Sequence, residues 1–236
     1  MIHIGCCGFP KAHGQYYQNL SAVEVQQTFY QVPKIMTAER WRREAPPHFV
    51  FTMKAWQLIT HPAESPTYQR LKRPIPPHRK RAVGFFQSSP EVYQAFKESL
   101  AFARALRAEV TLLQCPTRFA PTPINKAALT EFLKRMGKPP LRIALEVRGP
   151  WTREDVKPFV EQFSILHAVD PLTQTSCSWD PFYYRLHGRG GYTHRYSDED
   201  LKELVRIIGN RTCGYVFFNN VHMWEDAQRF LRLITP

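Results

Sequence analysis

The sequence predicts an α/β fold, a single eight-stranded (β/α)8 barrel of the TIM type that takes in residues 1–236. Eight short β-rich apolar runs occur along the chain, and most of them are separated by segments with helical spacing. Such runs are typical of parallel strands, which are covered on both faces. A chain of 236 residues is slightly short for this fold, but it is long enough for one large core.

The expected strands are the apolar runs themselves. Their residues are 2–5, the AVEV run that ends near Gln26, 49–54, 110–114, 142–148, 165–170, 182–188 and 215–220. Eight runs with mostly helical crossovers favour a closed barrel over an open, doubly wound sheet.

Helical spacing and capping residues predict the connections. The expected helices are 37–45, 90–108, 125–137, 152–163, 197–208 and 223–234. Thr37, Asn125 and Thr152 are candidate N-caps, and the SDEDL sequence after Arg195 and Tyr196 is a strong helix start. Between the sixth and seventh runs we expect only a loop.

Composition and missing motifs exclude several classes of protein. The chain is 43% hydrophobic and 22% charged, an ordinary globular mixture. It has no Gly-x-Gly-x-x-Gly and no P-loop, which argues against the common dinucleotide and nucleoside-triphosphate sites. No apolar run approaches the roughly 20 residues that span a bilayer, and the N-terminus lacks the pattern of a signal peptide. We therefore expect a cytoplasmic protein with no membrane contact.

The five cysteines contain no Cys-x-x-Cys pair, so a zinc ribbon or a thioredoxin-type site is not expected. Buried free thiols are the favoured interpretation. An iron–sulfur site built from scattered cysteines is the alternative.

The formal net charge of +12 favours a polyanionic partner, of which nucleic acid is the commonest. A generally basic surface, or arginine-rich ion pairs, is an equally good explanation. Residues 61–82 hold five prolines and six basic residues against a single acid, Glu64. The six are Arg70, Lys72, Arg73, Arg79, Lys80 and Arg81. This segment follows the third strand, so it is either a solvated loop or a basic Pro-rich insertion that binds DNA or RNA beside the barrel mouth.

Polar residues stand at the end of nearly every expected strand. Because all strands of a barrel end at one face, these side chains should converge on one cavity. Glu146 and Arg148 are two residues apart, as are Arg185 and His187, so each pair shares a face. The candidate substrate-binding residues are Glu24, Lys54, His61, Gln114, Arg148, Arg185 and Asn219, and the candidate catalytic residues are Glu146, Asp170 and His187.

The residue types suggest acid–base chemistry on an anionic compound. Glu146 and Asp170 are candidate bases or metal ligands, and His187 is a candidate general acid. Lysine and arginine suit a phosphate or carboxylate. A divalent metal is a candidate cofactor, although no metal-binding spacing occurs. The alternative to a site is a plug of salt bridges that closes the barrel top.

At these residues the chain resembles the YecE-like proteins, known as domain of unknown function 72. The matching stretches are VEVQQTFYQVP, FVFTMKAWQLITH, LLQCPTRF, ALEVRGPW, AVD, YRLHGR and VFFNN, in order over nearly the whole chain. The resemblance implies a TIM-type barrel and no settled activity. Three departures concern the mouth: Gln26 stands where Asn is usual, Gly149 where His is common, and the first loop lacks the usual Gly-Trp.

Three functions follow from these observations. The leading hypothesis is a nucleic-acid-binding barrel that hydrolyses phosphodiester bonds. The second is an enzyme for a small anionic or sugar-like metabolite, and the third is a non-catalytic binding protein. The sequence does not indicate the oligomeric state.

Overall fold

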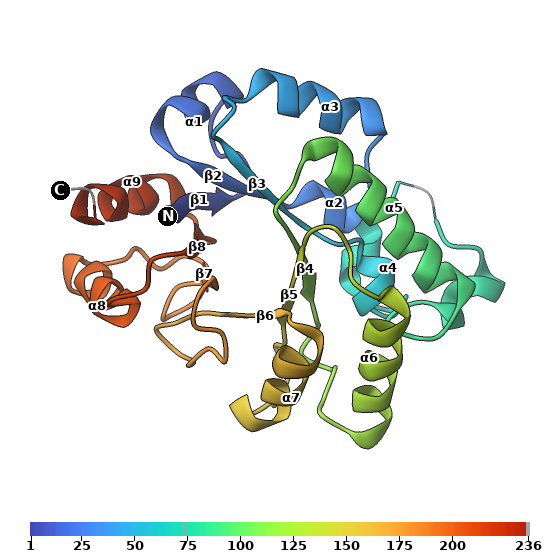
Figure 1. Cartoon of the computed structure of the whole chain (residues 1–236). Coiled ribbons are helices and arrows are strands. Elements are labelled where there is room, and N and C mark those ends of the chain that lie inside the picture. The colour runs from blue at the N-terminus through green and yellow to red at the C-terminus, as the bar shows by residue number, and fades with distance from the viewer. Residues whose placement is uncertain (73, 235–236) are drawn as a thin grey trace.

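The computed structural model describes residues 1–72 and 74–234, so Arg73 of the basic segment lies outside the described residues. The strands form one closed, parallel barrel in chain order from β1 to β8 (Figure 1). Their bounds are β1 Ile2–Cys7, β2 Ala22–Val25, β3 Val50–Lys54, β4 Val110–Gln114, β5 Arg142–Glu146, β6 Leu166–Val169, β7 Phe182–Leu186 and β8 Gly214–Phe218. The predicted (β/α)8 fold is confirmed.

Helices cover the outside of the barrel, and α9, the last helix, lies beside β1, the first strand (Figure 1). Their bounds are α1 His13–Asn19, α2 Gln27–Tyr30, α3 Ile35–Glu44, α4 Gln57–Thr60, α5 Pro90–Leu106, α6 Pro123–Met136, α7 Arg153–Phe163, α8 Asp198–Ile208 and α9 Met223–Ile234. Two 3-10 helices, η1 Pro66–Arg70 and η2 Pro77–Ala82, lie in the basic segment. None of the helices in the described part of the chain is long and apolar enough to cross a membrane.

Several strands end at an earlier residue than the sequence suggested, which places some of the predicted site residues on loops. Strand β5 ends at Glu146 and β7 at Leu186, so Arg148 and His187 lie on the loops that follow. Strand β8 ends at Phe218, which puts Asn219 just beyond it. Loop residues at a strand end can turn inward over the barrel mouth, whereas strand residues point alternately in and out.

The helix caps agree with the sequence at two of the predicted positions. Thr152 and Ser197 each form a full capping box, at the starts of α7 and α8. Thr37 lies inside α3 rather than before it, and Thr122 rather than Asn125 caps α6. The short helices α1, α2 and α4 were not expected, because four to seven residues are too few to give a helical period. The loop predicted between β6 and β7 is present, with no helix among its described residues.

The barrel interior changes from apolar to polar along its length. Val50, Val110, Ala144, Tyr183 and Tyr215 belong to one apolar cluster inside the barrel. One layer further on, the strand pairing sets Gln114 opposite Glu146 and Glu24 opposite Thr52. The polar layer therefore lies directly on an apolar floor, at the face where TIM barrels hold their sites.

Candidate functional site

A buried ion triad forms the base of the barrel mouth. The guanidinium of Arg185 donates from Nε and Nη2 to the Glu24 carboxylate, at 3.0 and 2.9 Å, and from Nη1 to Glu146 Oε2. Tyr183 donates its hydroxyl to Glu24 Oε2 at 2.7 Å, and Gln26 donates its amide to Oε1. Arg185 and Glu24 are fully buried. Each charge thus has a partner of the opposite sign.

The triad is held in its charged form. Burial alone would raise the pKa of Glu24, but Arg185, the Tyr183 hydroxyl and Lys54 together keep it below its ordinary value. Burial would likewise raise the pKa of Glu146, yet Arg185 and Arg148 hold it well below its usual range. Neither Glu24 nor Arg185 is among the residues that line the two cavities at the mouth, so these two predicted substrate-binding residues lie beneath them and support the residues above.

His187 and Arg148 lie above the triad and share Glu146. Arg148 Nε donates to Glu146 Oε1 at 2.7 Å, and His187 Nε2 lies 3.2 Å from the same oxygen. The Asn219 amide nitrogen lies 3.0 Å from His187 Nδ1. With Asn219 as the donor, Nδ1 accepts and Nε2 carries the proton toward Glu146. Asn219 and Glu146 therefore fix the tautomer and the orientation of the ring.

Asp170 does not join this cluster. Its Oδ2 accepts the backbone N–H of His187 at 2.8 Å, and its Oδ1 accepts that of Leu172 at 3.1 Å. Burial raises the pKa of Asp170, and these two backbone donors oppose the rise. The carboxylate thus ties the loop after β6 to the loop after β7, and it positions the backbone of His187. Of the three predicted catalytic residues, Glu146 and His187 contact each other through their side chains, whereas Asp170 contacts His187 only at its backbone N–H.

Lys54 is a buried basic residue at the mouth whose side chain has no polar partner among the described residues. It is 7% exposed, and its Nζ lies 3.9 Å from the centre of the Phe29 ring. No hydrogen bond or ion pair of its ammonium is found among the described residues. Burial, aided by the charge of Arg185, lowers the pKa of Lys54 to about 7. Near neutral pH a large share of this amine is therefore uncharged.

His61 and Gln114 complete the wall around Lys54. His61 Nδ1 lies 2.8 Å from the Thr60 hydroxyl, and its ring meets Phe29 edge to face. Burial, with Lys54 and Arg148 nearby, lowers the pKa of His61 to about 3, so its ring is neutral. Gln114 is buried, and its side chain lines the same cavity as Lys54.

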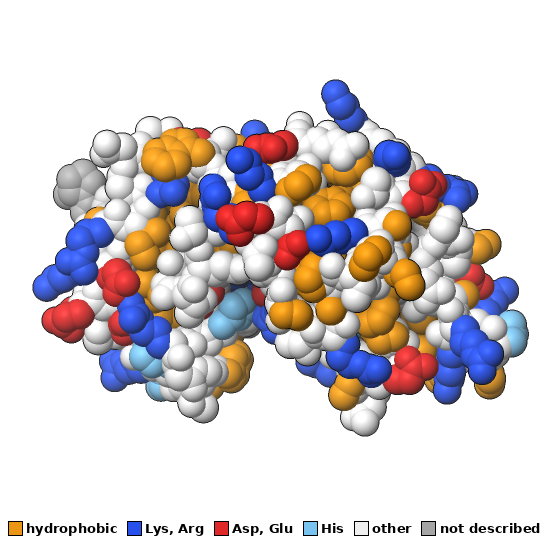
Figure 2. Space-filling model, turned by 90° about the horizontal axis from the view of Figure 1, so that it is seen from below, with side chains coloured by type: hydrophobic (Ala, Val, Ile, Leu, Met, Phe, Trp, Pro, Cys, Tyr) orange, Lys and Arg blue, Asp and Glu red, His pale blue; other side chains and the backbone are white. Residues whose placement is uncertain are grey.

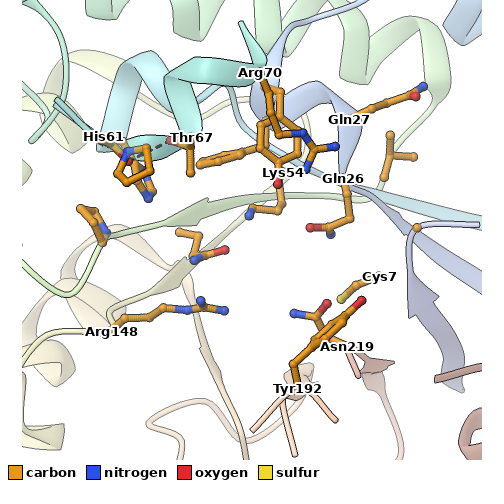
Figure 3. A pocket seen from close by; sticks show the side chains of 18 of the residues that line it. Cys7, Gln26, Gln27, Lys54, His61, Thr67, Arg70, Arg148, Tyr192 and Asn219 are labelled. Carbon is orange, nitrogen blue, oxygen red and sulfur yellow. Dashed lines mark hydrogen bonds between the residues drawn. The ribbon is translucent and has the colours of Figure 1, made fainter. Parts of the chain in front are cut away.

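Two adjoining cavities open at the mouth. The larger, of about 860 Å³, is lined by Lys54, His61 and Gln114, and the smaller, of about 570 Å³, by Glu146, Asp170 and His187. Arg148 and Asn219 line both. Figure 3 shows Lys54 between Arg70 on one side of the larger cavity and Arg148, Asn219 and Tyr192 on the other. Eight of the ten predicted residues therefore line one mouth with two connected cavities.

Several lining residues were not among the predicted ones. Cys7 contacts Glu24 Oε1 through its thiol at 3.3 Å, and burial beside that carboxylate raises its pKa well above the ordinary value. Arg118 and Tyr192 line the larger cavity from the loops after β4 and β7. The guanidinium carbon of Arg70 lies 3.6 Å from the centre of the Tyr30 ring, and both residues line the larger cavity. Arg118 and Tyr192 lie on loops several residues past a strand end and Arg70 lies in η1, so strand patterns did not identify them, and Cys7 is the last residue of β1, beyond the predicted run 2–5.

The donor set gives little support for a metal centre. Among residues 1–72 and 74–234, no group of three or more His, Cys, Asp or Glu side chains is placed to hold a metal ion. Glu24 and Glu146 already bind guanidinium groups, and Asp170 binds backbone N–H groups. A cation would have to displace these partners to use the carboxylates.

The cysteines are all free. Cys6, Cys7 and Cys115 are buried, as predicted, whereas Cys177 and Cys213 are half-buried. They do not gather into an iron–sulfur site among the described residues.

Comparison with known proteins agrees with this architecture. The family model "Protein of unknown function DUF72" matches residues 12–235. The curated UPF0759 protein YunF of Bacillus subtilis is 27% identical over 98% of this chain and 78% of its own length. A DUF72 family protein from Enterococcus faecalis has a TM-score of 0.73 at 20% identity, over 99% of this chain and 97% of that one. A D-tagatose 3-epimerase-like protein has a TM-score of 0.57 at 13% identity, over 98% and 95%, which shows a shared fold alone.

Proposed function

This chain belongs to the DUF72 family of proteins of unknown function, and we propose that its barrel mouth binds a small anionic, sugar-like metabolite and performs acid–base chemistry on it. The observation that carries the proposal is the larger cavity. Its volume of about 860 Å³ suits a small molecule. Lys54, Arg70, Arg118 and Arg148 line it, with Glu64 as the one acid among its lining residues.

Arg148 is the natural anion-binding residue. Its Nε donates to Glu146 and its Nη2 lies 3.2 Å from His187 Nε2, whereas no hydrogen bond of its Nη1 is found among the described residues, so Nη1 can turn to a ligand at the junction of the two cavities. Guanidinium groups bind carboxylates and phosphates through two parallel hydrogen bonds. The anion of the ligand would thus be held next to His187.

His187 is the proposed acid–base residue. Its side chain is 28% exposed and lines the smaller cavity, and its ring is oriented by Asn219. To act as a base, Nδ1 exchanges its hydrogen bond from the Asn219 amide for the substrate proton, and Glu146 beside Nε2 stabilises the imidazolium that forms. Sugar epimerases and isomerases are among the proteins that share the barrel fold. This likeness concerns the fold alone, and the class of substrate follows from the residues that line the cavity.

The test is a thermal-shift screen of the full chain with sugar phosphates and sugar acids. We expect the unfolding temperature to rise with ligand concentration, and Arg148→Ala to abolish the rise. Arg206→Ala, which removes an exposed arginine of α8, should leave it unchanged. Binding that survives Arg148→Ala, or no binding by any compound, would overturn the proposal. Binding with no turnover in any mixture would leave a non-catalytic binding protein.

Nucleic-acid binding is the second candidate, with phosphodiester hydrolysis as its reaction. The observation that favours it is the exposed helix η2, where Arg79, Lys80 and Arg81 follow one another in the connection between β3 and α5. On the face in Figure 2, by contrast, lysines and arginines are dispersed rather than gathered in one stripe. The charge on this face is therefore better suited to non-specific contact than to a defined groove.

A further inference from the structure

Lys54 has no role in the acid–base scheme, although it has the most unusual surroundings at the mouth. Its aliphatic stem and Nζ are enclosed by the barrel, and the ammonium faces the Phe29 ring instead of a carboxylate. The two nearby carboxylates are already bound to Arg185. A lysine kept only for stability would be expected to pair with an acid, because an unpaired buried charge is costly.

The position of Lys54 suits a nucleophile. It stands at the end of strand β3, on a rigid element, and Figure 3 shows it in the middle of the larger cavity. A desolvated lysine amine beside other cationic groups is a recognised route to imine formation with carbonyl compounds. Arg148, on the far side of the same cavity, can hold the negative group of such a compound.

We propose that Lys54 forms a covalent imine with an aldehyde or ketone that carries a carboxylate or a phosphate. This rests on the proposed function, since it names the substrate class and a nucleophile for the same cavity. The residues that carry it are Lys54 as the nucleophile and Arg148 as the anion-binding group.

The reaction balances without a further co-reactant. The lone pair of neutral Lys54 Nζ forms a C–N bond with the carbonyl carbon, and the C=O π electrons move to oxygen. A proton passes from nitrogen to that oxygen and gives a carbinolamine. With one further proton from solvent, the C–O bond breaks, water leaves, and a protonated imine remains. Nothing is oxidised or reduced.

The neighbours of Lys54 favour this reaction. Burial is the largest cause of the lowered pKa of Lys54, Arg185 and Arg148 lower it further, and Glu24 and Glu146 oppose them. The resulting pKa of about 7 makes the neutral nucleophile available near neutral pH. His61, which lies nearby, has a lowered pKa and is neutral, so it is not an acid that would protonate the amine of Lys54. Gln114 lines the cavity with an amide that can hydrogen-bond the carbonyl oxygen.

The experiment is reductive trapping. The full chain is incubated with pyruvate or with dihydroxyacetone phosphate, reduced with cyanoborohydride, and analysed by intact mass and peptide mapping. We expect one saturable adduct on the peptide that contains Lys54, and none in Lys54→Met or Lys54→Arg. The rate of trapping should rise as pH passes through about 7 and then level off, whereas a surface lysine would continue to gain reactivity to higher pH.

Controls separate this proposal from the binding site on which it rests. Lys97→Arg, an exposed position of α5, should keep the adduct, and thermal unfolding should show that the Lys54 variants are folded. Binding of a probe that Arg148→Ala abolishes, with no adduct on Lys54, overturns the imine and leaves the proposed function intact. Adducts spread over surface lysines and unchanged in Lys54→Arg also overturn it. If neither pyruvate nor dihydroxyacetone phosphate binds or reacts, both the imine and the proposed binding of small anionic carbonyl compounds are overturned.

Discussion

Arg185 lies between two buried carboxylates, and its removal should be costly. We expect Arg185→Met to lower the free energy of unfolding by about 3–5 kcal/mol, because Glu24 and Glu146 would stay buried without their main counter-charge. Urea unfolding at neutral pH measures this. Both carboxylates have lowered pKa values in the folded state. Their contribution to stability is therefore present above the ordinary glutamate pKa of about 4.3, and it is lost as pH falls through the lowered values.

Arg189 provides the matched control. It pairs with Asp200 and Glu203 at the surface, where its side chain is 40% exposed. Arg189→Met should cost less than about 1 kcal/mol, because exposed ion pairs are screened by solvent. Similar losses in the two variants would contradict a special role for the buried triad.

At the residue scale the sequence identified most of the mouth, for a simple geometric reason. Strands of a closed parallel barrel end at one face, so Lys54, Gln114 and Glu146 had to meet once the strands were recognised. The two-residue spacing of Arg185 and His187 also held, since both contact Glu146. The use of Asp170 for backbone N–H groups was not predictable, because it depends on how two loops fold over each other.

At the scale of elements, the short helix α4 is held in place by a glycine. The backbone N–H of Gly84 donates to Leu58 at 2.7 Å, and Phe86 donates to Ile59 at 2.9 Å. Gly84 has φ of +85°, and a Cβ there would meet the backbone of His61 at 2.4 Å. This contact joins the residues just after the basic segment to the turn that carries His61. No sequence pattern predicted it.

Gly84→Ala should therefore damage both stability and the site. We expect the free energy of unfolding to fall by more than about 1 kcal/mol, since alanine fits neither the backbone angle nor the space. Probe binding in the larger cavity should weaken as His61 is displaced. Gly14→Ala in α1 is the control, because nothing lies near its Cβ, and it should stabilise the protein by about 0.5–1 kcal/mol. Denaturant unfolding and ligand titration measure the two effects, and a harmless Gly84→Ala would contradict this account.

At the scale of the whole molecule, the fold followed from the alternation of strands and helices, whereas the cavities did not. A cavity depends on which loops close over the strand ends, and those loops have no regular period. Arg70, Arg118 and Tyr192 illustrate this, since each reaches the larger cavity from a different loop. Net charge was likewise visible in the sequence, but its distribution over the surface was not.

The distribution of charge determines which part of the surface can contact a polyanion. If the +12 chain contacts nucleic acid, the exposed run in η2 should contribute through phosphate contacts alone. Replacement of Arg79, Lys80 and Arg81 by glutamine should then reduce the slope of log affinity against log salt by roughly 2–3, because each lost phosphate contact removes about 0.9. Fluorescence anisotropy with duplex DNA and with RNA measures the slope.

The matched control removes the same charge elsewhere. Lys97, Lys134 and Arg206 are exposed on α5, α6 and α8, and their replacement by glutamine leaves η2 intact. A larger slope change in the η2 variant would locate the contact at the basic segment, whereas equal changes in both would assign it to net charge. Because a phosphate contact is indifferent to base sequence, the η2 variant should weaken binding to all sequences alike. If the unaltered chain does not bind nucleic acid even at low salt, nucleic acid is not a partner. The basic residues at the mouth would then serve the larger cavity and its anionic ligand alone.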